Sequence, residues 1–131
     1  MRMKAAVVVV GIALLLVGRS VVAHHAFSAE FDADKPVKLT GAVTKIEWTN
    51  PHTWFYIDVT DETGKVTNWG LEMGSPNGLM RAGWTRNSMK IGDVVTVEAS
   101  RARDGSNIGN ARVVILTRTG QRLFAASSQG Q

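Results

Sequence analysis

Apolar and polar residues alternate along most of the chain after residue 36, with the two-residue period that is typical of β-strands. The clearest case is the segment 53–60, whose two faces differ in character. One face carries Phe55, Ile57 and Val59, and the other carries Trp54, Tyr56 and Asp58. The segment therefore predicts a strand with one face in the core and a second, aromatic face.

The strand predicted before it, over residues 37–48, changes phase partway along. Val37, Leu39 and Val43 share one parity, whereas Ile46 and Trp48 share the other. Such a change within one strand predicts a β-bulge or a strong bend, and Gly41 favours either.

The other elements follow from strand patterns and turn residues. Strands are predicted at 65–73, around 95–99, at 111–118 and, as a short sixth strand, at 121–124. Pro51 marks a turn at 49–52, and Gly64 supplies a left-handed residue in the hairpin turn at 61–64. Ser75-Pro76 predicts the start of a helix of about two turns that ends near Gly83, with Leu79 and Met80 facing inward.

Three strands, a helix and two further strands are the element order of an OB-fold. The sequence therefore predicts a mostly β fold, a small five-stranded OB-like Greek-key barrel over residues 37–124 with one short helix between strands 3 and 4. Residues 24–36 are expected to form an N-terminal arm, and residues 125–131 a flexible tail. A small β-sandwich with a capping helix is the alternative.

The first 23 residues have the composition of a secretory signal peptide, expected to form a helix. Arg2 and Lys4 precede an unbroken apolar run of 13 residues, and Val21 and Ala23 fit the small-residue cleavage pattern. The run is shorter than the ~18–20 residues that span a bilayer. We expect cleavage after Ala23, a periplasmic or secreted protein, and no stable membrane anchor afterwards. A short anchor and a buried helix are the alternatives.

Cleavage changes the charge of the protein. The full chain has a net charge of +4, but loss of Arg2, Lys4 and Arg19 leaves 12 basic and 11 acidic residues, a net charge of +1. Because phosphate neutralisation drives nucleic-acid binding, we do not expect a nucleic-acid partner. The chain contains no cysteine, so the 108 residues after Ala23 must be held together by their core alone.

Several segments of the chain resemble a family of small exported bacterial proteins known only as a domain of unknown function. They include "AHHAFSAEFD", "GAVTKIEWTNPHTWFYIDV", "VTNWGLEMGSPNGLMRAGW", "KIGDVVTVEASRARDGSNIGNARVV" and "RLFAASS", which together extend over nearly all of residues 23–128. The resemblance implies a secreted, OB-like barrel, and it implies no activity.

Histidines provide a candidate metal site. Cleavage after Ala23 would make His24 the first residue, so that one residue offers both an α-amine and an imidazole. Nitrogen-rich sites of this kind suit Cu(II). Either His52 completes the site or His25 does so through the intervening backbone amide. The first arrangement requires the arm to reach the 49–52 turn, as it would if Phe27 and Phe31 covered Trp54 and Tyr56. Solvated histidines at a terminus and beside a turn are the alternative.

Aromatic and polar residues also predict a ligand-binding edge at one rim of the barrel. Trp54 and Tyr56 could stack on a base or a sugar, or they could be covered by the arm and the helix. Trp69 and Trp84 are assigned to the core. The candidate ligand-binding residues are Trp48, Asn50, His52, Trp54, Tyr56, Arg101, Arg103 and Asn107.

No catalytic motif is recognisable in the chain, so we do not expect an enzyme. The sequence predicts a periplasmic binding module for an unknown small ligand. A copper-handling protein with Cu(II) as its cofactor is the first alternative, and a structural partner of an envelope protein is the second.

Overall fold

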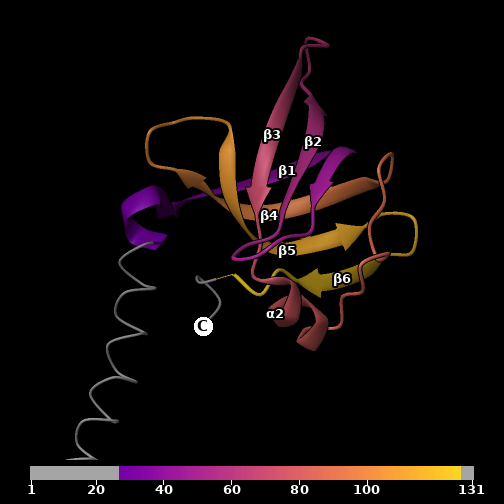
Figure 1. Ribbon diagram of the computed structural model, residues 1–131. Coiled ribbons are helices and arrows are strands. Elements are labelled where there is room, and N and C mark those ends of the chain that lie inside the picture. Colours follow the sequence, from indigo (N-terminus) through magenta and orange to yellow (C-terminus); the bar gives the residue numbers. More distant parts are fainter. Residues whose placement is uncertain (1–26, 128–131) are drawn as a thin grey trace, which may run out of the picture.

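The chain folds into a small barrel with one short helix at its lower end in Figure 1. The structure is a computed structural model that describes residues 27–127. In chain order its elements are β1 (Phe31–Glu47), β2 (Trp54–Thr60), β3 (Val66–Glu72), α2 (Pro76–Arg81), β4 (Val94–Ala102), β5 (Ile108–Leu116) and β6 (Gln121–Phe124).

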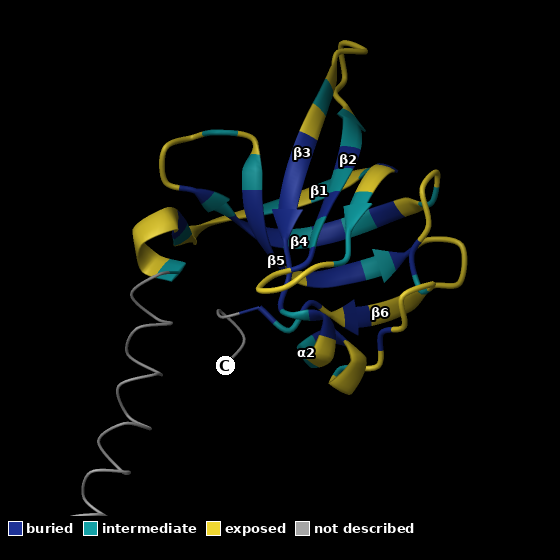
Figure 2. Ribbon diagram, in the orientation of Figure 1, coloured by how far each residue is buried: buried dark blue, intermediate teal, exposed yellow. Residues whose placement is uncertain are grey.

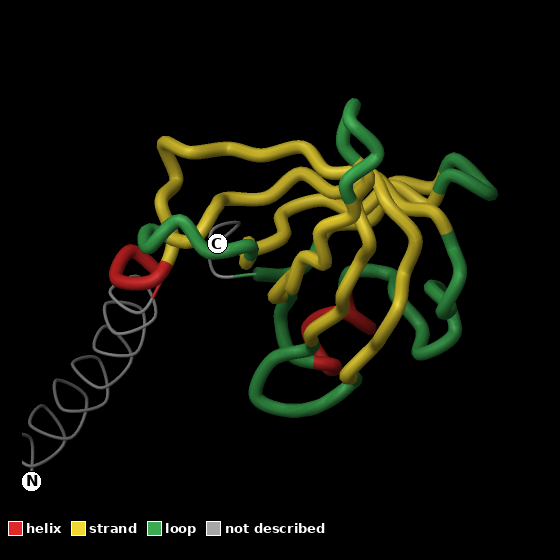
Figure 3. The backbone as a smooth tube through the Cα atoms, turned by 90° about the horizontal axis from the view of Figure 1, so that it is seen from above, coloured by secondary structure: helices red, strands yellow, loops and turns green. Residues whose placement is uncertain are grey.

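The strands form one sheet in the order β3-β2-β1-β4-β5-β6, and β3 also pairs with β5. All neighbours in that order are antiparallel, whereas the β3–β5 pair is parallel and short, joining Gly70–Glu72 to Ile108–Asn110. This last pair closes the sheet, and the strands curve around a common interior when viewed from above (Figure 3). The predicted mostly β, OB-like architecture is confirmed. No helix within residues 27–127 has the length and apolar character needed to cross a bilayer.

The predicted irregularity of the first strand is a β-bulge at Thr44. Val43 pairs with Ile57 and Lys45 pairs with Tyr56, so that Thr44 is the extra residue. The bulge explains why the apolar parity changes after Val43. Gly41 is required nearby because a β-carbon there would lie 2.2 Å from the carbonyl oxygen of Asp58. The two strands could not approach each other so closely with any side chain at this position.

β1 begins at Phe31, six residues earlier than the pattern predicts. Phe31 pairs with Ala102 and is buried, and its ring stacks on that of Phe27 with 5.8 Å between the centroids. Pro36 pairs with Ser100, so the intervening residues 32–35 bulge out against a single residue of β4. Because these residues are mostly polar, the hydrophobic pattern gave no sign that the strand begins before residue 37.

The barrel interior is filled by the apolar face that the pattern assigned to it. Phe55, Ile57 and Leu71 are fully buried, and Figure 2 shows the burial concentrated where the strands face one another. Trp69 and Trp84 are also buried, as predicted.

The helix α2 begins where the sequence predicts, but it packs against the barrel through fewer residues than the sequence predicts. The Ser75 hydroxyl caps it by accepting a hydrogen bond from the Gly78 amide at 3.1 Å. Leu79 is buried, but Met80 is 52% exposed, so the expectation that both face inward was wrong. Consecutive helical residues point in directions about 100° apart, and in this short helix the core contacts the side that carries Pro76 and Leu79.

Candidate functional site

A groove of about 360 Å³ lies on the outer face of β2 and β3. This is the face that OB-folds use for ligands, between the β1–β2 and β4–β5 loops. Its lining consists of two aromatic residues, three polar residues, a glycine and an isoleucine, namely Trp54, Tyr56, Glu47, Asn68, Asn107, Gly70 and Ile108. Neither Phe27 nor Phe31 lines it, so those rings do not take the covering role expected of them.

The aromatic wall of the groove depends on Gly70. This residue is the cross-strand partner of Tyr56, and a β-carbon on it would lie 3.1 Å from Tyr56 Cε1 and 3.7 Å from Trp54 Cζ3. Both rings therefore lean over the position where β3 has no side chain. Trp54 and Tyr56 remain half-buried, which leaves part of each ring open to a ligand.

The Thr44 bulge supplies the polar wall. Because it shifts the parity of β1, Lys45 and Glu47 share the outer face with Tyr56 and Trp54, their cross-strand partners. The Lys45 ammonium lies 5.3 Å from the centroid of the Tyr56 ring and 2.7 Å from Glu47 Oε1. Lys45 is thus paired with a carboxylate, and none of the residues that line the groove is basic.

The opposite lip of the groove is the β4–β5 loop, which Arg101 holds in shape. Its guanidinium lies 5.1 Å from the centroid of the Trp69 ring, and its Nη2 donates to the Gly105 carbonyl at 2.8 Å and to Asn107 Oδ1 at 3.4 Å. The Gly70 amide donates to the Asn107 carbonyl at 3.1 Å and so fixes the loop to β3. The hydrogen bonds of Arg101 are thus made to the loop itself.

Arg103 fastens the loop to the segment before β1. Its backbone amide donates to the Glu30 carbonyl at 2.9 Å, and its Nε donates to the Ser28 carbonyl. Its Nη1 also lies 3.8 Å from Asp32 Oδ2. Like Arg101, it is engaged with the chain's own groups.

The predicted site residues therefore separate into groups. Trp54, Tyr56 and Asn107 line the groove together. Trp48 lies elsewhere, beside Met73 and Trp84, and Asn50 is exposed in the turn before Pro51. His24 and His25 lie outside the described residues.

His52, the remaining predicted residue, contacts a buried carboxylate. Its Nδ1 lies 3.3 Å from Glu72 Oε1, to which Asn110 Nδ2 also donates at 3.1 Å. Glu72 is only 8% exposed, whereas the His52 side chain is 50% exposed. Glu72 pairs with Trp54 across the sheet, so this corner adjoins the groove.

Burial raises the pKa of the Glu72 carboxyl above its ordinary value, because the charged form loses its water. The charge of His52 opposes this rise, and the negative charge of Glu30 adds to it. Hydrogen bonds from Asn110 and His52 also favour the ionised form. A raised carboxyl pKa beside a histidine at a cleft is a common property of functional sites.

Sequence reasoning missed four residues of the groove and one beside it. Glu47 and Asn68 are polar residues in strands, Gly70 has no side chain, and Ile108 opens a strand after a loop. Glu72 had a detectable signal, because an acidic residue between Leu71 and Met73 interrupts an apolar run. Its burial, however, depends on Asn110, 38 residues later in the chain.

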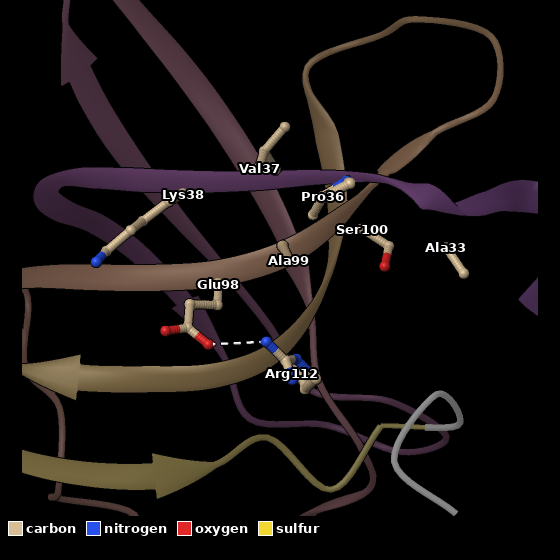
Figure 4. A pocket seen from close by; sticks show the side chains of 8 residues that line it. All are labelled: Ala33, Pro36, Val37, Lys38, Glu98, Ala99, Ser100 and Arg112. Carbon is tan, nitrogen blue, oxygen red and sulfur yellow. Dashed lines mark hydrogen bonds and ion pairs between the residues drawn. The ribbon is translucent and has the colours of Figure 1, made fainter.

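A second groove, of about 650 Å³, lies on the outer face of β1, β4 and β5. Glu98 there pairs with Arg112 at 2.9 Å (Figure 4) and with Arg122 at 3.5 Å. Its lining consists of Ala33, Pro36, Val37, Lys38, Glu98, Ala99, Ser100 and Arg112. It contains no aromatic ring and none of the predicted ligand residues, so we favour the smaller groove as the candidate site.

Comparisons with known proteins identify the family of the chain, but they do not indicate an activity. The family model described as "Family of unknown function (DUF6152)" matches residues 13–111. No curated protein matches the chain. Among solved structures, the mitochondrial single-stranded DNA-binding protein Rim1 of S. cerevisiae is similar, with 13% sequence identity and a TM-score of 0.48. The match covers 66% of this chain and 95% of that one, and at this similarity it carries no inference about ligands.

Proposed function

The chain belongs to DUF6152, a family of unknown function, and we propose that it is an exported binding module that holds a neutral saccharide in the groove of β2 and β3. The observation that carries the proposal is the pair of half-buried rings, Trp54 and Tyr56, which lean over Gly70 beside the groove. Aromatic faces of this kind bind the apolar face of a sugar ring and leave its hydroxyl groups for polar neighbours.

The charge of the groove favours a neutral ligand. Glu47 contributes a carboxylate to the lining, and Lys45, the nearby cation, is already paired with it. A polyanion would need basic residues to replace its counterions. Carboxylate and amide groups such as those of Glu47 and Asn107 instead suit the hydroxyl groups of a saccharide.

The proposal can be tested by titrating neutral oligosaccharides, cellotetraose, maltotetraose and chitotetraose, against the tryptophan fluorescence of the protein. Trp54→Ala and Tyr56→Ala should each weaken binding by about 5- to 150-fold, if a sugar gains as much from stacking on one aromatic ring as the ~1–3 kcal/mol that a nucleic-acid base gains. Phe124→Ala is the matched control, since Phe124 is an exposed aromatic residue on β6. Binding of oligothymidylate but of no saccharide would contradict the proposal.

Export is part of the proposal, and it rests on the composition of residues 1–23. Intact mass spectrometry of protein recovered from the envelope of its host should give a chain that begins at His24. A chain that retains Met1 would contradict it.

The second candidate function is copper handling, in which the amine and imidazole of His24 bind Cu(II) together with His25 or His52. The specific observation in its favour is the contact of the half-exposed His52 imidazole with Glu72, in which Nδ1 lies 3.3 Å from Oε1. Glu30, only six residues after His24, acts electrostatically on Glu72, so the described start of the chain approaches the same corner.

The two candidates can be separated with one variant. A single glycine inserted before His24 moves the α-amine away from the imidazole of that residue. It should abolish Cu(II) binding that is tighter than that of a His-His-Ala peptide, and it should leave saccharide binding unchanged. If wild-type protein binds Cu(II) no more tightly than the peptide, the copper function is wrong.

A further inference from the structure

The larger groove, on the outer face of β1, β4 and β5, takes no part in the saccharide or copper functions. Its volume of about 650 Å³ is within the range of pockets that hold small organic molecules. Two β-bulges shape it. Residues 32–35 bulge out of β1, and Ala33 among them forms part of the wall. Arg112 is the extra residue of β5 at its register shift against β4, and bulges of this kind redirect side chains beside functional sites.

Basic side chains surround a single carboxylate in this groove. Arg112 Nη2 lies 2.9 Å from Glu98 Oε2 (Figure 4), and Arg122 Nη1 lies 3.5 Å from Glu98 Oε1. Each oxygen of Glu98 is therefore paired with a different arginine. Lys38, the cross-strand partner of Glu98 on β1, is exposed, and its ammonium makes no ion pair or hydrogen bond within residues 27–127. Three cations around one carboxylate leave two positive charges in excess.

The strand register explains why the arginines lie over the barrel wall. Val114 belongs to the core, so its neighbour Val113, the partner of Glu98, points to the outer face. Val113 is nevertheless only 1% exposed. Arg112 precedes it, and Arg122 is its diagonal neighbour on β6. Long arginine stems commonly cover apolar surface of this kind while the guanidinium group stays in water.

Ion pairing alone does not explain the excess of positive charge. The part of the chain after Ala23 has 12 basic and 11 acidic residues, a net charge of +1, so the groove carries a larger excess than that whole part does. Neighbouring cations repel one another, and a network that served only stability would gain nothing from the surplus. An anion bound in the groove would neutralise it.

We propose that this groove binds the phosphate group of a phosphate monoester through Lys38 and Arg112. A phosphate monoester carries a charge of about −1.5 to −2 near neutral pH, which matches the excess, and guanidinium groups bind it through parallel hydrogen bonds. Lys38 and Arg112 belong to strands on opposite sides of β4, about 10 Å apart at the backbone. Phosphate oxygens point in several directions and can meet both side chains, whereas the two oxygens of a carboxylate lie on one side of the group.

The organic part of the ligand would contact the small and apolar residues of the groove, Ala33, Pro36 and Ala99. None of the residues that line this groove lines the groove of β2 and β3. The inference is therefore independent of the saccharide proposal, and either can fail without the other.

The test is calorimetric titration of the exported protein with glycerol 3-phosphate at low ionic strength, since salt screens exposed charges. Arg112→Gln and Lys38→Gln should each weaken binding by about 10- to 150-fold, the range for loss of one charge-assisted hydrogen bond. Arg118→Gln and Lys65→Gln are the matched controls. Both remove the same charges at exposed positions, in the β5–β6 loop and in the β2–β3 turn, and should leave binding unchanged.

A second measurement locates the ligand and reports folding. In nitrogen-15 NMR spectra, glycerol 3-phosphate should shift the amide signals of Lys38, Ala99 and Ser100 and leave those of Trp54 and Tyr56 in place. The circular dichroism of all four variants should match that of the wild type, because the substituted side chains are exposed.

A parallel titration identifies the source of the phosphate group. Phosphatidic acid presents the same monoester on a membrane, so vesicles of phosphatidylcholine with and without phosphatidic acid are compared with the soluble probe. Binding to either form that Arg112→Gln and Lys38→Gln weaken supports the proposal and names the source.

Three results would overturn the proposal. One is that neither glycerol 3-phosphate nor phosphatidic acid vesicles bind. Another is that succinate, a dicarboxylate, binds as tightly, because the groove would then select charge and not phosphate. The third is an equal loss of affinity in Arg118→Gln and Lys65→Gln, which would assign the effect to the overall charge of the protein.

Discussion

The two faces of the β2–β3 hairpin carry different kinds of residue although they belong to the same two strands. The inner face carries Phe55, Ile57 and Leu71, all fully buried and in contact with other apolar residues. The outer face carries two half-buried rings, a glycine and a nearly buried carboxylate, Trp54, Tyr56, Gly70 and Glu72.

This difference shows which face folding alone can explain. Packing requires apolar side chains of the right volume inside the barrel. It requires neither large rings on the solvent side, nor a missing side chain beneath them, nor a carboxylate that loses most of its water. The outer face is therefore the region where the residues are best explained by binding.

The largest expected effect is that of Phe55→Ala, which tests the inner face. Loss of a fully buried ring leaves a cavity and should lower the free energy of unfolding by ~3–5 kcal/mol, measured by urea denaturation. Tyr56→Ala, one residue further along β2 on the other face, should cost only ~1 kcal/mol. Equal losses would contradict the proposed contrast between the faces.

Substitutions of glycine test the same contrast between the inner and outer faces, with smaller expected changes in the free energy of unfolding. A β-carbon on Gly109 would lie 3.1 Å from Ala99 Cβ and 3.2 Å from Leu71 Cδ2, side chains that the core holds in place. Gly109→Ala should therefore lower the free energy of unfolding by ~1–3 kcal/mol through overpacking. Chemical denaturation with circular dichroism gives this value, and a neutral result would show that the interior can relax.

Gly70→Ala is the corresponding change on the outer face and should affect stability less. The added methyl group meets the Tyr56 ring, which is half exposed and can rotate away, and alanine removes the ~0.5–1 kcal/mol disadvantage of glycine in a strand. We expect stability to change by less than ~0.5 kcal/mol while saccharide binding weakens. A variant that binds normally would show that the position of the rings over Gly70 is unimportant.

The smallest expected effect on stability is the pH dependence contributed by Glu72. Burial raises the pKa of its carboxyl in the folded protein, so the folded state holds the proton more tightly than the unfolded state does. The stabilisation is present at acidic pH and is lost as the pH rises through the interval between the unfolded and folded pKa values.

Glu72→Gln removes this dependence. The free energy of unfolding of the variant should therefore increase relative to that of the wild type as the pH is raised from 4 towards 7, when both are measured by urea denaturation. The opposite slope would mean that the hydrogen bonds from His52 and Asn110 outweigh the loss of water.

Local patterns in the sequence predict much of the fold. The alternation in 53–60 predicts both faces of β2, and the parity change between Val43 and Ile46 predicts the bulge that the register places at Thr44. Ser75-Pro76 predicts the start of α2, and Gly64 has the expected positive φ of 86°. Each of these features depends on residues within one or two elements.

The site is less predictable because its parts come from distant segments. Trp54 and Tyr56 are recognisable from their own strand, but the burial of Glu72 depends on Asn110. Arg101 and Arg103 are residues of a type that often contacts ligands. Both, however, donate hydrogen bonds to backbone carbonyl groups of the chain itself. Only the closed barrel determines which charged side chains remain available.

The short parallel seam between β3 and β5 has a consequence for any occupant of the groove. The bond from the Gly70 amide to the Asn107 carbonyl joins the strand to the opposite lip, so the same contact closes the barrel and sets the width of the cleft. A molecule that contacts both lips would bind only while β3 and β5 are paired, and it would therefore make transient opening of this strand pair less frequent. Slower hydrogen exchange at the Gly70 amide would then report occupancy directly.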